Sequence, residues 1–141
     1  MSLFNVFDVA GSALTAQSIR LNVVASNLAN ADSVAPDPAS AYRARAPVFQ
    51  SMLQDTGQGA ADDPSAVGVR VLGIWQSPAE PVKRHQPGHP LADADGYVWA
   101  SNVSAVEEMA NMISASRSFQ TNVEVMNTSR DLLLKTLSMG R

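Results

Sequence analysis

The side chains best suited to chemistry lie in a short stretch past the middle of the chain, around His85 and His89. Two histidines four residues apart can bind one metal ion from a single helix face. Here Pro87 and Gly88 lie between them and prevent that helix, and no third ligand is nearby. We therefore predict no metal site at these histidines.

Two acidic pairs follow, and neither matches a reactive site. Asp93 and Asp95 resemble the start of a calcium loop, but the third acidic ligand and the closing glutamate are missing, so a turn that includes Gly96 is the better interpretation. Glu107 and Glu108 are typical of the charge at a helix N-terminus rather than of a catalytic pair. The sequence has no Ser/His/Asp arrangement and no glycine-rich phosphate loop. We predict no catalytic residue and no cofactor, so the protein is not expected to be an enzyme or to bind a small-molecule substrate.

Composition narrows the remaining classes of function. The chain has 141 residues, a net charge of −3 and no cysteine. Because nucleic-acid binding depends on a basic patch, this mild acidity gives no reason to expect a nucleic-acid partner. The first residues lack a basic segment of the signal-peptide type, and no apolar run approaches the ~20 residues that cross a bilayer.

Proline divides the chain into three regions. All eight prolines and six of the eight glycines lie in residues 32–100, whereas residues 1–31 and 101–141 contain no proline. We expect one helical domain made of residues 1–31 plus 101–141, and a β- and loop-rich outward region over 32–100. The predicted fold class is mainly α, with long terminal helices packed as a discontinuous coiled coil.

The middle region carries two strand signals and one loop signal. The alternation Val67, Val69, Val71 predicts a strand that can extend to Trp75, and residues 96–99 predict a second strand after a turn. Residues 55–66 are rich in Gly and Asp, and we interpret them as a mobile loop.

Apolar residues recur every seven positions near the N-terminus, which is the pattern of helices that wind around one another. One row consists of Phe7, Leu14, Leu21 and Leu28, and a second of Leu3, Ala10, Val24 and Ala31, interrupted by Gln17. A helix of roughly 30 residues would be about 45 Å long.

The C-terminal segment begins with a capping box, Ser104 followed by Glu107, and Gly140 is a suitable stop signal. Between them we predict one apolar seam with alternating steps of three and four residues, in which Ser116 and Arg130 are polar positions. Its members are Met109, Met112, Phe119, Val123, Met126, Leu133 and Leu137. The methionines are interpreted as packing residues rather than as a ligand groove.

The N-terminal segment carries unusually little charge, with Asp8 and Arg20 as the charged residues in 1–31. Asn and Ser occupy positions where a water-facing helix normally carries Lys or Glu. One interpretation is an internal helix of a monomeric bundle. The alternative, which we favour, is a helix covered on several sides by other subunits, since uncharged groups are cheaper to desolvate. In that case the two ends gain much of their order on assembly, because single amphipathic helices depend on packing.

Two terminal segments resemble a known family. The run "ASNLANADS" at residues 25–33 resembles the N-terminal signature of bacterial flagellar rod and hook proteins, and "SASRSFQTNVEVMNTSRDLLLKTLSMGR" resembles their C-terminal signature. The resemblance covers nearly the whole chain, and the run "PGHPLADADGYV" together with the short length favours a proximal-rod subunit. It implies a structural subunit of the basal-body rod in the periplasm, exported by the flagellar type III apparatus and polymerising through its terminal helices into a hollow, torque-transmitting tube.

The resemblance implies other rod subunits, both copies of this chain and its paralogues, and the export apparatus as partners. Two alternatives stay open: a paralogous proximal-rod subunit of similar size, and a helical export chaperone or adaptor. The residues expected at the assembly interface are Leu3, Phe7, Leu14, Leu21, Val24, Asn27, Leu28, Asn30, Met109, Met112, Phe119, Val123, Met126, Leu133 and Leu137.

Overall fold

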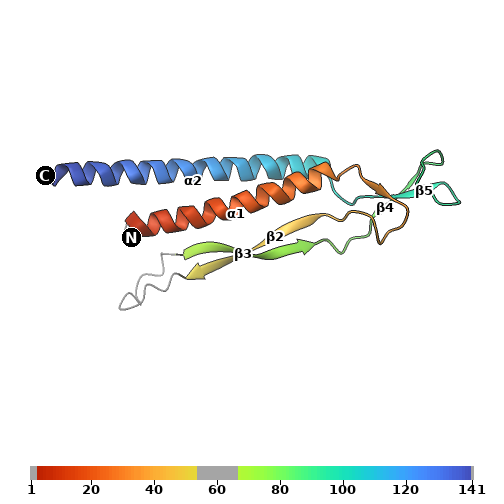
Figure 1. Ribbon diagram of the computed structural model, residues 1–141, viewed down its shortest axis with the longest axis horizontal. Coiled ribbons are helices and arrows are strands. Elements are labelled where there is room, and N and C mark those ends of the chain that lie inside the picture. Colours follow the sequence, from red (N-terminus) through yellow and green to blue (C-terminus); the bar gives the residue numbers. More distant parts are fainter. Residues whose placement is uncertain (1–2, 54–66, 141) are drawn as a thin grey trace.

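Two long helices frame a middle region made of short strands, as the sequence predicts (Figure 1). The computed structural model describes residues 3–53 and 67–140. Its elements are α1 (Leu3–Ala29), β1 (Val34–Ala35), β2 (Arg45–Leu53), β3 (Val67–Gln76), β4 (Val82–His85), β5 (Tyr97–Ala100) and α2 (Ala105–Met139). The loop expected over 55–66 lies outside the described residues.

The molecule is elongated and built in layers. The two helices lie antiparallel and side by side, and the β2–β3 hairpin lies along the opposite side of α1 (Figure 1). The small sheet of β1, β5 and β4 lies beyond the end at which α1 stops and α2 begins (Figure 1). Helix α1 is therefore the central layer of this part of the chain.

This central position accounts for the low charge of α1. Its buried side chains are small or uncharged: Ala10, Ala16, Val23, Val24 and Asn27. On the hairpin side, Ser12 Oγ accepts a hydrogen bond of 3.1 Å from the Val69 amide of β3. The chain itself thus covers two sides of α1. On those two sides, α1 is the internal helix of a monomer, which was one of the two interpretations of its low charge.

Helix α2 begins and ends where the sequence predicts. Ser104 is the N-cap, and its side chain accepts from the Glu107 amide at 3.4 Å. The helix ends at Met139, and Gly140 follows with φ of −91°, so the stop does not use a left-handed glycine. At 35 residues, α2 is longer than the 27 residues of α1.

The apolar seam predicted for α2 divides into two rows. Met112, Phe119, Met126 and Leu133 are half-buried, whereas Met109, Val123 and Leu137 are exposed. The fully buried positions are Ala115 and Ser129, two heptads apart. Small residues at the contact allow two helix backbones to approach closely, so the larger side chains lie to the sides of the contact line.

The hairpin contains one strand that the sequence predicted and one that it did not. β3 begins at the expected valine repeat and reaches Gln76, and β2 pairs with it antiparallel, Arg45 opposite Gln76 and Pro47 opposite Ile74. Pro47 argues against a strand, because proline cannot donate to a ladder. In a sheet of two strands β2 is an edge, where one proline is tolerated. A register shift at Val48/Phe49 further distorts the pairing.

The small sheet has the order β1-β5-β4, and both pairings are antiparallel. β5 matches the strand predicted over 96–99, displaced by one residue, while β1 and β4 were not predicted. Val98 and Ala100 on β5 are 0% and 2% exposed and form the centre of this sheet. Gly96 precedes β5 with φ of +78°, which L-residues rarely adopt.

Candidate assembly interface

The asparagine-rich motif of α1 forms a junction between three elements. Asn27 is 1% exposed. Its Nδ2 donates to the Arg45 carbonyl at 2.7 Å and to Glu108 Oε2 at 3.1 Å. Its Oδ1 accepts from the Arg45 amide at 3.0 Å and from the Tyr42 hydroxyl at 3.0 Å. One side chain therefore joins α1 to the start of β2 and the first turn of α2.

The geometry of Asn27 explains why an amide is needed there. A primary amide has two N–H donors and two lone pairs on oxygen, and all four are used. Toward Arg45 the amide donates to the carbonyl and accepts from the N–H, as the backbone of a neighbouring strand would. The junction extends the edge of β2 onto α1 and sets the position of the hairpin beside the helix pair.

The rest of the motif ends the helix. Asn30 Nδ2 donates to the Ser26 carbonyl at 2.8 Å, and the Ser33 hydroxyl donates to the Asn30 carbonyl at 2.8 Å. The Ser26 hydroxyl also lies 3.2 Å from the Tyr42 hydroxyl. The two carbonyls also accept from the amides of Asn30 and Ser33, at 3.2 Å each, so the side chains add a second hydrogen bond to each carbonyl. Asn27 and Asn30, both expected at the assembly interface, are thus engaged inside the chain.

Most of the other expected residues of α1 are partly or fully buried. Phe7, Leu14, Leu21 and Leu28 are half-buried, and Val24 is 4% exposed. Leu3 is the first residue of α1. This row retains some exposed apolar surface after the chain has packed on itself.

A row of exposed apolar side chains lies along one side of α2. Its members, all with more than a third of the side chain exposed, are Val106, Met109, Ile113, Val123, Leu134 and Leu137. Their spacing places them on one side of α2, next to the side that contacts α1. We call this row the α2 stripe. It contains three of the residues predicted for assembly: Met109, Val123 and Leu137.

The residues first considered for chemistry have local structural roles. The His85 ring packs on Tyr97 with a centroid distance of 4.9 Å, and His89 Nδ1 accepts from the Leu91 amide at 3.1 Å. Asp93 Oδ1 accepts from the amides of Asp95 and Tyr97, at 3.0 and 2.8 Å, and so forms the predicted turn.

Two further properties of the described residues bear on function. Within 3–53 and 67–140 there is no group of three or more His, Cys, Asp or Glu placed to hold a metal ion. In the same ranges, no helix is both long and apolar enough to span a membrane.

Asp37 has a local structural role in a loop turn. Hydrogen bonds from the Ser40 amide, the Ser40 side chain and the Ala39 amide hold the pKa of Asp37 below its usual value.

Three features of the site were missed from sequence. Tyr42 and Arg45 complete the junction, but nothing in their surroundings marks them as partners of Asn27. The buried positions of α2 are Ala115 and Ser129, and small residues spaced two heptads apart are the sequence signal that marks them.

Comparison with known proteins gives matches at both ends and over the whole length. A family model described as flagella basal body rod protein matches residues 7–35, and one described as flagellar basal body rod FlgEFG protein C-terminal matches residues 94–139. The chain is 55% identical to the flagellar basal-body rod protein FlgC of Yersinia enterocolitica, over 100% of both chains. It is 52% identical to the proteins of that name in Escherichia coli O6:H1 and Salmonella typhimurium, again over 100% of both chains.

Proposed function

Because the chain belongs to the FlgC family of flagellar basal-body rod proteins and is a structural subunit of the rod, we propose that it polymerises through its terminal helices into a hollow tube that transmits torque. No catalytic activity is indicated by its relatives, which are named as rod proteins. In this proposal its partners are copies of itself, paralogous rod subunits and the flagellar type III export apparatus, and neither nucleic acid nor a small-molecule substrate takes part.

The observation that carries the proposal is the α2 stripe. Apolar side chains recur along one side of a 35-residue helix, from Val106 at 79% exposure to Leu137 at 64%. Exposed apolar side chains gathered on one side of a helix mark an interaction site in soluble proteins. Gln120, Asn127 and Arg130 lie on the same side and interrupt the stripe. A neighbouring helix laid along the far part of the stripe, from Val123 to Leu137, would bury these side chains, at about 25 cal/mol per Å² of apolar surface. The terminal helices of adjacent subunits would then form the discontinuous coiled coil that the heptad spacing predicts.

The division of the chain follows from the same proposal. Residues 1–31 with 101–141 form the rod core, and residues 32–100 face outward and contact neighbours. Contacts between unlike surfaces that do not close into a ring generate a helical filament. Resistance to torque then comes from many modest interfaces acting together, with no need for one strong bond.

Charge insertion in the far half of the α2 stripe tests the proposal. We expect Val123→Asp and Leu134→Asp to reduce recovery of the chain in isolated basal bodies, and with it swimming, because each places a charge in a subunit contact. Both side chains are exposed, at 36% and 53%, so the circular dichroism of the free chain should not change.

Thr128→Asp is the matched control, since Thr128 is exposed on α2 outside the stripe. Its incorporation should equal that of the unmodified chain. Full incorporation of both stripe variants would contradict polymerisation through this helix.

A further inference from the structure

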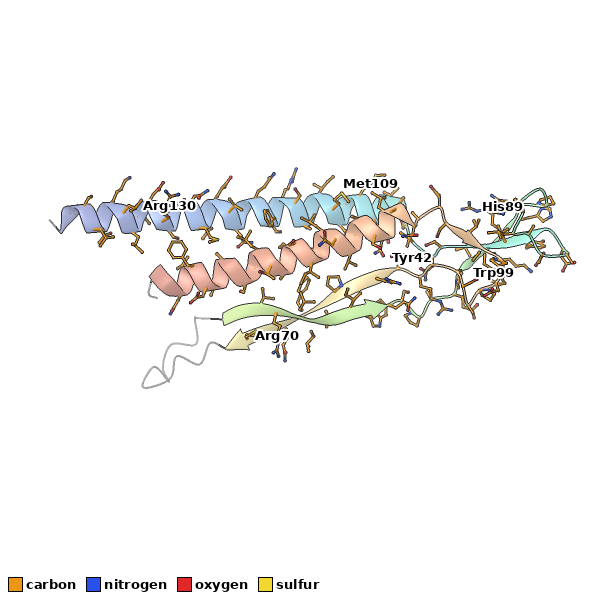
Figure 2. All side chains as sticks on the ribbon, viewed as in Figure 1. Tyr42, Arg70, His89, Trp99, Met109 and Arg130 are labelled. Carbon is orange, nitrogen blue, oxygen red and sulfur yellow. The ribbon has the colours of Figure 1, made fainter. Side chains whose placement is uncertain are left out.

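Two exposed apolar patches lie on opposite sides of the molecule. The hairpin patch consists of Val48, Leu72 and Trp75, which are 43%, 60% and 51% exposed. The helix patch is the first part of the α2 stripe, Val106, Met109 and Ile113, at 79%, 53% and 57% exposure. Figure 2 shows Arg70, beside the hairpin patch, and Met109, in the helix patch, on opposite outer sides of the three layers.

The register of the hairpin places Trp75 and Val48 on one face. Trp75 pairs with Ala46 and Gly73 with Val48, and Leu72 is the unpaired residue at the register shift. Ala46 and Val48 are two residues apart on β2, so their side chains share a face of the sheet. Trp75 and Val48 are 51% and 43% exposed, so α1 leaves this face of the hairpin open. Ile74, which pairs with Pro47 on the other face, is 56% exposed as well.

The helix patch occupies one side of the first turns of α2. Steps of three and four residues join Val106, Met109 and Ile113, so the three side chains lie in a row. Ala115, which is 0% exposed, marks a different side of α2 as the one that faces α1. The row therefore has no partner within the described part of the chain.

The two patches lie at the same level along the long axis. Asn27 is bonded both to Arg45, at the end of the hairpin that holds Trp75, and to Glu108, between Val106 and Met109. A second copy laid alongside with little axial shift would bring its hairpin patch against the helix patch of the first.

The charges around the two patches are complementary. In the described hairpin, 45–53 and 67–76, the charged residues are Arg45, which belongs to the Asn27 junction, and Arg70, which is exposed. In the first turns of α2, Glu108 is bonded to Asn27 and Glu107 is exposed, and the first basic residue is Arg117. Such complementarity favours contact between unlike patches over contact between like ones.

We propose that copies of this chain pack side by side in the rod, with the hairpin patch of one copy against the helix patch of the next. The inference rests on the proposed function and goes beyond it by assigning an outward element, the hairpin, to the subunit contact. The contact joins two different surfaces, so each copy offers one free surface of each kind and the row can be extended by further copies.

Cysteine cross-linking tests this arrangement, since the chain has no cysteine of its own. Ala46→Cys lies beside Trp75, and Ala110→Cys lies beside Met109, and both alanines are exposed. The variants are produced in one strain, and its basal bodies are isolated and oxidised. We expect cross-linked dimers when both variants are present and none when either is present alone. A chain carrying both cysteines should give a ladder of dimers, trimers and longer products.

Thr128→Cys paired with Ala46→Cys is the matched control, because Thr128 is exposed on the same helix but lies about 27 Å farther along it than Ala110. It should give at most a tenth of the cross-linked product. The inference is overturned by dimers from either variant alone, by equal product from the control pair, by cross-links to a chain of different mass, or by no product. Each rod preparation is first tested for the presence of this chain. If the chain is present and no cross-linked product forms, the proposed hairpin–helix contact is refuted, whereas the proposal that the chain polymerises in the rod is not.

Discussion

Removal of the Asn27 side chain should weaken the whole arrangement of helices and hairpin. Asn27→Ala deletes four hydrogen bonds, of 2.7, 3.1, 3.0 and 3.0 Å. A neutral hydrogen bond contributes about 1 kcal/mol net, and one to a carboxylate somewhat more. Water can reach Arg45 and Glu108, which are not fully buried, and recovers part of the loss. We expect the free energy of unfolding to fall by about 3 kcal/mol.

Urea unfolding of the full-length chain, followed by circular dichroism and tryptophan fluorescence, measures this loss. With a slope of about 2 kcal/mol per M, the midpoint should move down by roughly 1.5 M. Asn22→Ala is the control, because Asn22 lies exposed on the same helix, and it should change stability by no more than about 0.5 kcal/mol. If both variants unfold at the same urea concentration, the junction does not hold the layers together and the reasoning is refuted.

Asn27→Asp tests the direction of the Nδ2 hydrogen bonds. The new carboxyl would be buried, and one of its oxygens would face the Arg45 carbonyl and Glu108. Burial and the nearby negative charge should raise its pKa above the unfolded value of about 3.9. A group whose pKa is raised by folding favours the folded state most below its unfolded pKa, and this advantage is lost as the pH rises through the folded pKa. Relative to the unmodified chain, the variant should therefore be less stable at pH 7 than at pH 4, and a constant difference would contradict this account.

Three further substitutions probe the elements around the junction. Ala115→Leu should lower stability by about 1–3 kcal/mol, because Ala115 is 0% exposed against α1, whereas Ala110→Leu on the open side should have little effect in thermal unfolding. Gly96→Ala should lower the melting temperature, because φ is +78° and the new Cβ would lie 2.9 Å from a proline side chain, and Gly88→Ala, with nothing within 4 Å, should not. Ser104→Ala should cost about 1 kcal/mol through loss of the N-cap bond, read as lower helicity and a lower midpoint in urea.

Local signals in the sequence determined the type and limits of most elements. Proline-free, heptad-spaced ends predict helices, and the Ser104 cap and Gly140 place the limits of α2 within a residue. The valine alternation predicts β3 for the same kind of reason, since side chains alternate between the faces of a strand. These features depend on neighbours in the sequence, so no tertiary contact was needed to find them. The terminal signatures also led to the rod family.

Tertiary structure alone decided which residues meet. Nothing near Asn27 in the sequence indicates Tyr42, Arg45 and Glu108 as its partners, because they come from two other segments of the chain. Pro47 concealed β2, which forms because an edge strand can accommodate a missing N–H. The low charge of α1 was correctly recognised as a sign of burial, but it could not show that α2 and the hairpin provide much of that burial. The periodicity of apolar residues shows that one side of a helix is apolar. Which part of that side is buried within the chain, and which part stays exposed for a neighbouring subunit, depends on the tertiary structure.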